Sequence, residues 1–420
     1  MAPSISGSTK PCGPRDLSLM RIIAHGLIPA TRATGVVQAV SRELAIQGQQ
    51  VSAVPQALLN RSQAKGRSQV DAAFASGSLI RSWPMRGTVH ITTAADHHWL
   101  RVALLHRMDA WVRNSERNYG VDDRLLEQAQ RVALELIAKA GPLKRAELLE
   151  AWDQEGLMEA FKGEDVSSYR RRHLLLHLQI RGLLAQGPRQ GNEHLVVDVR
   201  DLPGAHTGPG GASGGGKGTD GYRSALAEIA RRYATSHGPV TAADLSRWTT
   251  LPLGESRRAL EDAVELTNAA DYGLEAAAGQ VPLVRAIVED WPNGELHCLA
   301  PEEATPARRL NPELVYLRAD LPDLLAENRK DAERTLFIGA FDELHVGYKD
   351  RRPLTDEAGE QLICPGKNGM FLPFLVDRGR LVAVRPAGRG LNWAPGARRS
   401  GRLERDVERA LSEMNQRLGL

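Results

Sequence analysis

An internal repeat is the feature of this 420-residue chain that most restricts its fold. The phrase AKAGPLKRAEL at residues 138–148 recurs as TSHGPVTAADL at 235–245, each time between two stretches with helical periodicity. Such self-similarity arises when one supersecondary unit is used several times along a chain. A chain of this length has room for about two to four such domains, each with its own core.

The middle copy of the repeat shows the pattern most clearly. Helices are expected over 124–140, 143–156 and 166–184, the first of them ending at Gly141-Pro142. Two apolar strands follow in AQGPRQGNEHLVVDV, around the polar and basic run Gly-Pro-Arg-Gln-Gly-Asn. Three helices followed by a strand hairpin form a winged helix, which is a variant of the helix-turn-helix.

The first and third copies follow the same order. In the first, helices are expected over 16–27, 33–47 and 68–77, and a hairpin over 78–92 that turns at Met85-Arg86-Gly87. In the third, three helices are expected within 224–266, followed by a hairpin in YGLEAAAGQVPLV. Near the C-terminus, TLFIGAFDELHVGYKDRR and GMFLPFLVDRGRLVAVRP alternate apolar and polar residues as strands do.

These patterns predict an α+β fold in which three tandem winged-helix units form a concave DNA-binding surface. A β-rich C-terminal region with an amphipathic terminal helix, SGRLERDVERALSEMNQRLG, is expected to pack back on the body. The predicted boundaries are a disordered lead at 1–16, winged helices at 17–120, 121–202 and 222–300, a glycine-rich linker or loop at 203–221, and the C-terminal region at 301–420.

Composition narrows the class of protein. No apolar run reaches the roughly 18–20 residues that a membrane span needs, and the N-terminus lacks the apolar region of a secretory signal. The three widely spaced cysteines predict neither a disulfide framework nor a metal site. We expect a monomeric protein of the bacterial cytoplasm, associated with the nucleoid. The net charge of +3 is mild, but the excess of Arg over Lys suits phosphate and base contacts.

Basic side chains in the predicted helices and hairpins are the candidates for DNA contact. Winged helices also serve as protein-interaction modules, so this second use stays open from the pattern alone. A run of arginines on a helix can equally be a solvated face. The predicted contact residues are Arg81, Arg86, His90, Arg170, Arg171, Lys349 and Arg351.

Most common catalytic motifs are missing from the sequence. His173 and His177 have helical spacing, but no third ligand follows at a zinc-enzyme distance, and His97-His98 has no nearby partner set. The glycine-rich GGASGGGKGTDG is not placed between a strand and a helix as a phosphate-binding loop would be. No Gly-x-Ser-x-Gly elbow occurs. The sequence therefore predicts no metal and no cofactor.

A glutamine-rich cluster, Gln47-Gly48-Gln49-Gln50, lies between two helix-like stretches. One interpretation is a helix C-terminus with polar capping side chains. The other interpretation is a functional site, and it depends on the sequence that follows. Farther along the chain, Asp342 in FDELHVGYKDRR is a lone carboxylate that we expect to be structural rather than catalytic.

The segment RELAIQGQQVSAVPQALLNR, followed by GSLIRSWPMRGTVHITTAADHHWLR, resembles the winged-helix DNA glycosylases of the AlkZ/YcaQ type. Members carry a Gln-x-Gln or Gln-x-Asp motif, matched here by Gln47 and Gln49. They then carry a Thr/Ser-Trp-x-Met-Arg-Gly-Thr-x-His stretch, matched by Ser82–His90. The family has a larger apolar residue where this chain has Gly48. The C-terminal strands also look like the family's, so the resemblance covers nearly the whole chain.

The resemblance implies a monofunctional glycosylase that excises alkylated purines, N7-guanine or N3-adenine, from double-stranded DNA. Its expected substrates include bulky antibiotic adducts and interstrand crosslinks, often in self-resistance, with Gln47 and Gln49 as the catalytic pair. Glutamine suits this chemistry, because alkylation makes the base a cationic leaving group and removes the need for a strong acid. An amide orients water at C1′ and cannot act as a base.

Two other functions remain open from the sequence. A non-catalytic DNA-binding regulator needs neither the glutamine pair nor its matched hairpin, and it would bind undamaged DNA without forming an abasic site. A protein-interaction module would bind DNA weakly and with little dependence on salt, because it makes few phosphate contacts.

Overall fold

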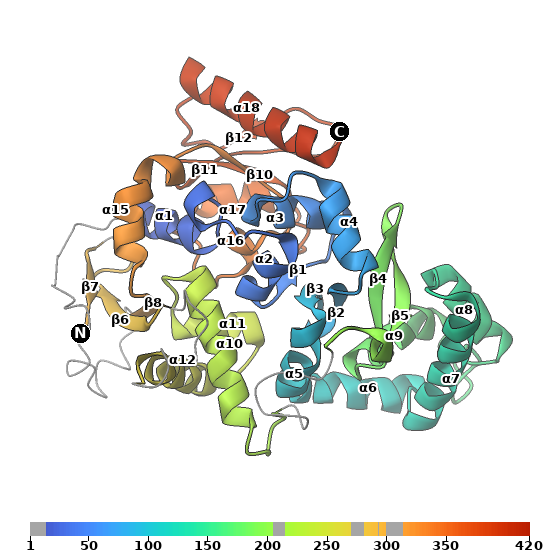
Figure 1. The fold of residues 1–420 in the computed structure, drawn as a ribbon. Coiled ribbons are helices and arrows are strands. Elements are labelled where there is room, and N and C mark those ends of the chain that lie inside the picture. The colour runs from blue at the N-terminus through green and yellow to red at the C-terminus, as the bar shows by residue number, and fades with distance from the viewer. Residues whose placement is uncertain (1–13, 205–214, 270–280, 293, 300–313) are drawn as a thin grey trace. The chain divides into compact units, whose positions relative to one another are not determined.

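The computed structural model describes residues 14–204, 215–269, 281–292, 294–299 and 314–420. Contacts divide the chain into two compact units (Figure 1). Unit 1 comprises Met1–Glu43, Ala53–Arg67 and Ala227–Leu420, and unit 2 comprises Leu44–Ser52 and Ser68–Leu226. In the described part of the chain, no helix has both the length and the apolar character to cross a membrane.

Unit 2 contains a five-stranded antiparallel sheet in the order β1-β3-β2-β4-β5. Two hairpins, β2–β3 and β4–β5, are joined where Arg81 of β2 pairs with Gln186 of β4. The short strand β1 pairs with β3 at the edge of the sheet. The strands are β1 (Ile46–Gln47), β2 (Leu79–Met85), β3 (Thr88–Thr93), β4 (Leu184–Gln190) and β5 (Glu193–Asp198).

Both predicted hairpins of unit 2 are confirmed. Arg86 and Gly87 form the turn of β2–β3 with φ angles of 57° and 62°, the conformation that two-residue hairpin turns require. The β4–β5 turn is at Gly191-Asn192, whereas the Gly187-Pro188 pair predicted for the turn lies within β4. Each hairpin carries a proline where its register shifts, and proline has no N–H for the ladder.

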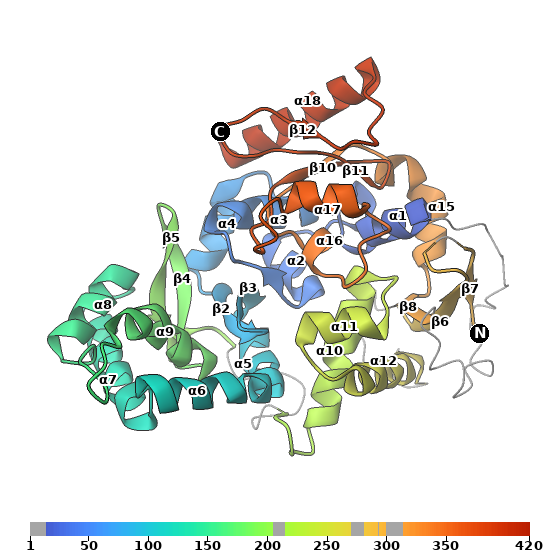
Figure 2. The same ribbon diagram turned by 180° about the vertical axis from the view of Figure 1, so that it is seen from behind.

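Helices surround the sheet of unit 2, and Figure 2 shows α7, α8 and α9 around the β4–β5 hairpin. Their core is built on the buried Trp152, whose indole N–H donates to the carbonyl of Ala129 at 2.9 Å. The helices predicted over 124–140, 143–156 and 166–184 are confirmed. The helices are α4 (Arg67–Ala75), α5 (Ala94–Leu104), α6 (Asp109–Tyr119), α7 (Asp123–Ala140), α8 (Arg145–Gln154) and α9 (Ser167–Ile180).

The internal repeat has a common backbone feature. After Gly141-Pro142, Leu143 forms an isolated antiparallel bridge with Val196 of β5, and α8 begins two residues later. After Gly238-Pro239, Val240 forms the same kind of bridge with Tyr316, and α11 begins two residues later. The order helix, bridge, helix, helix and strands is the order expected for a winged helix, and the assignment of the repeats to that class stays a prediction.

Unit 1 combines helices with two small sheets of orders β12-β11-β10-β9 and β7-β6-β8. Its helices are α1 (Pro14–Ala24), α2 (Val36–Glu43), α3 (Val54–Arg61), most of α10 (Tyr222–His237), α11 (Ala242–Thr249), α12 (Leu253–Asn268), α15 (Leu321–Ala332), α16 (Glu343–Val346), α17 (Glu357–Ile363) and α18 (Gly401–Leu418). Its strands are β6 (Leu283–Val288), β7 (Leu296–Cys298), β8 (Leu314–Arg318), β9 (Leu336–Ile338), β10 (Phe374–Asp377), β11 (Arg380–Val384) and β12 (Asn392–Trp393).

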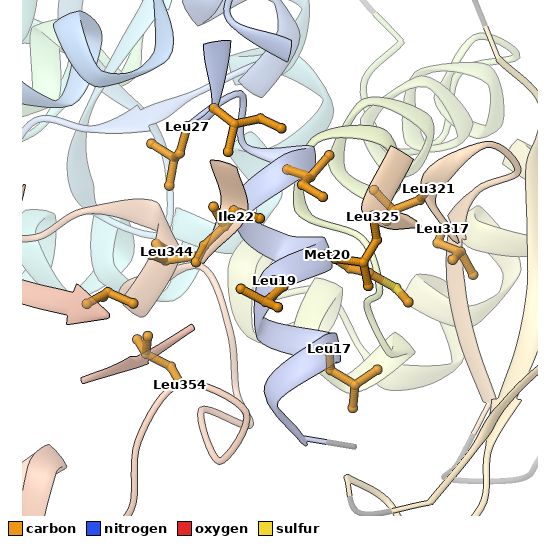
Figure 3. Close-up of a cluster of buried hydrophobic side chains, with 14 of the residues drawn as sticks. Leu17, Leu19, Met20, Ile22, Leu27, Leu317, Leu321, Leu325, Leu344 and Leu354 are labelled. Carbon is orange, nitrogen blue, oxygen red and sulfur yellow. The ribbon is translucent and has the colours of Figure 1, made fainter. Parts of the chain in front are cut away.

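The apolar side of α1 lies at the centre of the main core of unit 1. Figure 3 shows Leu17, Leu19 and Met20 of this helix among leucines from distant parts of the sequence, including Leu321 and Leu344. Burial of such side chains contributes about 1.5–3 kcal/mol each, so this cluster fastens the N-terminal helix to the C-terminal region.

The terminal helix α18 confirms the prediction that it packs back on the body. Leu403 and Val407 of α18 join Leu375 and Ala383 of the four-stranded sheet in one buried cluster. The side chain of Ser400 caps the helix, and Gly419 ends it with a φ of 72°.

Several local predictions are wrong. The helix expected over 33–47 ends at Glu43, because Leu44 takes a φ of 66° that no helix continues. The strand expected over 335–352 is limited to β9, since Asp342 caps the short helix α16. The third-copy hairpin, the Gly-rich linker and the N-terminal lead fall largely on 270–280, 205–214 and 1–13, outside the described residues.

Candidate active site

The glutamine segment lies on the edge strand of the unit 2 sheet (Figure 1). Gln47 ends β1 and is half-buried, while Gln49 and Gln50 follow the strand and are exposed. The capped-helix interpretation is therefore wrong, because Gln47 pairs with a strand instead of ending a helix. A bend at Gln49 and a short 3₁₀ helix (Val51–Ala53) connect the segment to α3.

Gly48 is held on both sides of its backbone. Its N–H donates to the carbonyl of Val89 at 2.8 Å, and its carbonyl accepts from Nε of Arg81 at 2.9 Å. A Cβ at this position would lie 3.0 Å from Cδ1 of Ile91, so glycine allows β1 to approach β3 closely. The glycine that replaces the family's apolar residue is thus part of a fixed segment rather than a loose one.

Arg81 connects the two hairpins instead of facing a phosphate. Besides the carbonyl of Gly48, its guanidinium bonds to Oε1 of Gln186 across the β2–β4 junction. Burial lowers the pKa of Arg81 to about 10, which leaves the group charged at neutral pH. The structure therefore gives Arg81 a positioning role for the backbone between the two glutamines.

His90 lies directly opposite Gln47 in the ladder, and Ser82 lies opposite His90 on the other side. Opposed residues share one face of a sheet, so the three side chains form a cross-strand row. Nε2 of His90 is 3.0 Å from Nη2 of Arg86, and Nδ1 is 2.9 Å from the carbonyl of Thr88. An arginine only donates and a carbonyl only accepts, so His90 is neutral with its proton on Nδ1.

The face of the sheet that carries Gln47 is rich in hydroxyl groups. Thr88 and Thr92 lie two residues to either side of His90 and so share its face. The hydroxyls of Ser82, Thr88 and Thr92 are buried and make no hydrogen bond to any part of the chain that the structure describes. Spare hydrogen-bonding capacity in such a place is typical of functional sites. Sequence reasoning missed these hydroxyls, although Ser82 and Thr88 belong to the matched motif.

The remaining predicted DNA contacts fall into two groups. Arg86 at the hairpin turn is half-buried, Arg171 is exposed beside Asp153 at 2.7 Å, and Lys349 of unit 1 is exposed. Arg351 is mostly buried and bonds to Glu360 at 3.0 Å. Those four side chains come from separate elements, and only Arg86 belongs to the sheet that carries the glutamines.

Two predicted DNA contacts are corrected by burial. Arg170 is 6 % exposed, and its guanidinium donates to the carbonyls of Tyr119, Leu157 and Glu159. His90 is 0 % exposed. A side chain whose donors are all directed inward reaches no phosphate, so neither residue is retained as a DNA contact.

Two side chains considered in the sequence have structural environments. Asp342 is buried and forms a bidentate pair with Arg61 at 2.8 and 2.7 Å. Burial opposes ionisation, but the Arg61 guanidinium holds the pKa of Asp342 below its usual range. On α9, His177 stacks on Trp111 with ring centroids 4.3 Å apart. The structural interpretation of Asp342 fits these contacts.

Comparison with known proteins places the chain in a family. The model of a family described as DNA glycosylase AlkZ-like matches residues 40–416. Among solved structures, the chain is similar to the Streptomyces sahachiroi DNA glycosylase AlkZ, with a TM-score of 0.62 and 19 % sequence identity over 98 % of each chain. At that identity the similarity shows a common fold. No curated protein matches the chain at a significant level.

Proposed function

Because the chain belongs to the AlkZ-like DNA glycosylase family, we propose that it is a monofunctional glycosylase for alkylated purines in duplex DNA. Gln47 and Gln49 are the catalytic pair in this proposal. The observation that carries it is the fixed glycine between them, because Gly48 is hydrogen-bonded through both its N–H and its carbonyl. The two amides thus flank a backbone point that cannot drift.

The proposed reaction is hydrolysis of the bond between C1′ and the purine nitrogen. Alkylation at N7 or N3 leaves a positive charge on the base, and the bond electrons neutralise that charge as the base departs. An amide oxygen of the pair accepts a hydrogen bond from water and directs its oxygen to C1′, which carries developing positive charge. The water proton passes to solvent, because a glutamine does not take it up at neutral pH.

The environment of the pair suits this division of work. Gln47 is half-buried beside neutral His90, whereas Gln49 is exposed where DNA approaches. The buried hydroxyls of Ser82 and Thr92 supply further hydrogen-bonding groups on the same face. We assign phosphate contacts to the cations that remain accessible, Arg86, Arg171 and Lys349.

We propose bulky adducts and interstrand crosslinks made by genotoxic natural products as the physiological lesions, with self-resistance as the benefit. This choice rests on the resemblance to AlkZ/YcaQ-type glycosylases. It also suits a catalytic pair on a sheet edge, since an adduct too large to be flipped fully into an enclosed pocket can still present its C1′ there.

The test is incubation of the full chain with matched duplexes that carry N7-methylguanine, N3-methyladenine, a bulky N7 adduct or an N7 crosslink. Alkali-sensitive sites are expected with the cationic adducts and not with undamaged DNA. Strand cleavage before alkali treatment would contradict a monofunctional reaction. Binding to undamaged DNA with no abasic product from any adduct would instead favour the DNA-binding regulator.

A further inference from the structure

Four ionisable side chains meet in the interior of unit 1, far from the glutamine pair in sequence. His25 follows α1, Glu43 ends α2, His237 ends α10 and Glu343 begins α16. All four are buried, with exposed fractions of 2 % or less. Nδ1 of His25 is 3.0 Å from Oε2 of Glu43, and Nε2 of His237 is 3.7 Å from that oxygen and 3.6 Å from Oε2 of Glu343.

The hydrogen bonds of His25 fix which ring nitrogen carries its proton. The hydroxyl of Tyr348 donates its one proton to the carbonyl of His237 at 2.8 Å. That hydroxyl is also 2.9 Å from Nε2 of His25, so it must accept there from Nε2–H. The other nitrogen, Nδ1, is therefore a bare lone pair, and it faces the carboxylate of Glu43.

The same argument fixes the proton of His237. The hydroxyl of Ser236 donates to the carbonyl of Arg232 at 2.8 Å, and it is 2.8 Å from Nδ1 of His237. Nδ1–H is therefore the donor to Ser236, and Nε2 is the bare nitrogen. Nε2 makes no hydrogen bond. It points between Glu43 and Glu343 at distances too long for such a bond.

Two imidazole lone pairs thus converge on two carboxylates, an arrangement that repels itself unless a cation lies among them. The nearby buried charges do not supply that cation. Arg61 pairs with Asp342 at 2.7 Å and lies 3.4 Å from Glu43, and Arg21 lies 3.9 Å from Asp244. Two guanidinium groups face four carboxylates, which leaves a formal excess of two negative charges in a dry interior.

We propose that His25, Glu43, His237 and Glu343 bind one divalent transition-metal ion of the zinc class. Imidazole nitrogen and carboxylate oxygen are its ordinary ligands, and the donor atoms of His25, Glu43 and His237 lie within 4.8 Å of one another. Each imidazole gives its other N–H to a hydroxyl that is itself anchored on a carbonyl, as metal-bound histidines do. The enclosed site is structural, and it ties together the ends of four helices.

The test is the metal content of the untagged full chain, purified without chelators from zinc-supplemented medium. About one equivalent per chain is expected for the wild type. His237→Gln and Glu343→Gln should lose it. His345→Gln is the matched control, because His345 is also buried in unit 1 beside one carboxylate, that of Glu360 at 2.9 Å. It should keep its metal. A wild-type chain without metal, or equal loss in the control, would overturn the proposal.

A second measurement covers variants that fail to fold. Metal is removed from the wild type with a chelator, and Co²⁺ is added while visible absorption is followed. Saturation near one equivalent, with the strong absorption of low-coordinate Co²⁺, is expected together with recovery of the thermal midpoint. Tyr348→Phe keeps every ligand and removes the anchor of His25, so it should weaken Co²⁺ binding about 10–100-fold. No Co²⁺ spectrum, or unchanged affinity in Tyr348→Phe, would contradict the site.

Discussion

The first and second repeats of the chain use the same backbone position differently. In the second repeat, Leu143 bridges to β5 and α8 begins two residues later, with Glu147 closing the helix end onto the N–H of Lys144 at 2.7 Å. In the first repeat, Ile46 and Gln47 bridge to β3, but α3 begins only at Val54. The residues between them include the exposed Gln49 and Gln50.

This difference separates scaffold from site. A buried leucine followed at once by a helix cap stabilises a fold and leaves nothing exposed at the bridge. The first repeat instead places a polar segment after the bridge and holds its glycine with Arg81. The same supersecondary unit therefore carries stability in one copy and, in our account, catalysis in the other.

The largest expected effect is on the scaffold copy. Trp152→Ala removes the central side chain of the second-repeat core and should lower the free energy of unfolding by about 3–5 kcal/mol. Chemical denaturation measures this loss. Below the new transition, the rate of base release per folded molecule should stay close to that of the wild type. A rate loss as large as that of the glutamine variants would blur the contrast between the copies.

Arg81→Met should reduce single-turnover base release by about 100-fold, because it frees the carbonyl of Gly48 and can misplace the amides by about 1 Å. Arg81→Lys should recover part of the rate. Since Arg81 makes no phosphate contact in our account, the dependence of DNA binding on salt should not change. A reduced salt slope would return Arg81 to the DNA surface.

Gly48→Ala should cost about 1–3 kcal/mol of stability and slow base release about tenfold, since the added Cβ would meet Cδ1 of Ile91. The control is Ile91→Val, which removes that carbon. The double variant should be more active than Gly48→Ala alone. Additive losses would show that the close approach of β1 to β3 is unimportant.

Arg86→Gln should have the smallest effect, a loss of a few-fold in DNA affinity, because it removes one charge at the hairpin turn. The slope of log Kd against log salt should fall by about one unit. Gln190→Ala, at the turn of the second hairpin, is an uncharged comparison and should leave the slope unchanged. An unchanged slope in Arg86→Gln would remove this turn from the phosphate contacts.

Local patterns predicted much of this fold. The helical periods, the Gly-Pro breaks and the two hairpin turns are encoded within a few residues each, and α7, α18 and the β2–β3 turn lie where the sequence indicated. The union of two hairpins through Arg81 and Gln186 was not predictable, because strand pairing across 105 residues has no local signal.

The candidate site was predicted in part for the same reason. Gln47 and Gln49 are close in sequence to the hairpin that holds them, so a motif could identify them. The roles of Arg81 and Arg170 depend on burial, which an arginine run does not reveal. The proposed metal ligands extend from His25 to Glu343, and no spacing rule joins residues so far apart.

The most direct test of the central claim is single-turnover release of N7-alkylguanine by Gln47→Ala/Gln49→Ala, with Gln50→Ala as the matched exposed control. The account predicts a fall of about 100- to 1,000-fold in the double variant, with DNA affinity and the thermal midpoint nearly unchanged. The control should keep its rate. A double variant that releases the base as fast as the wild type would contradict the account.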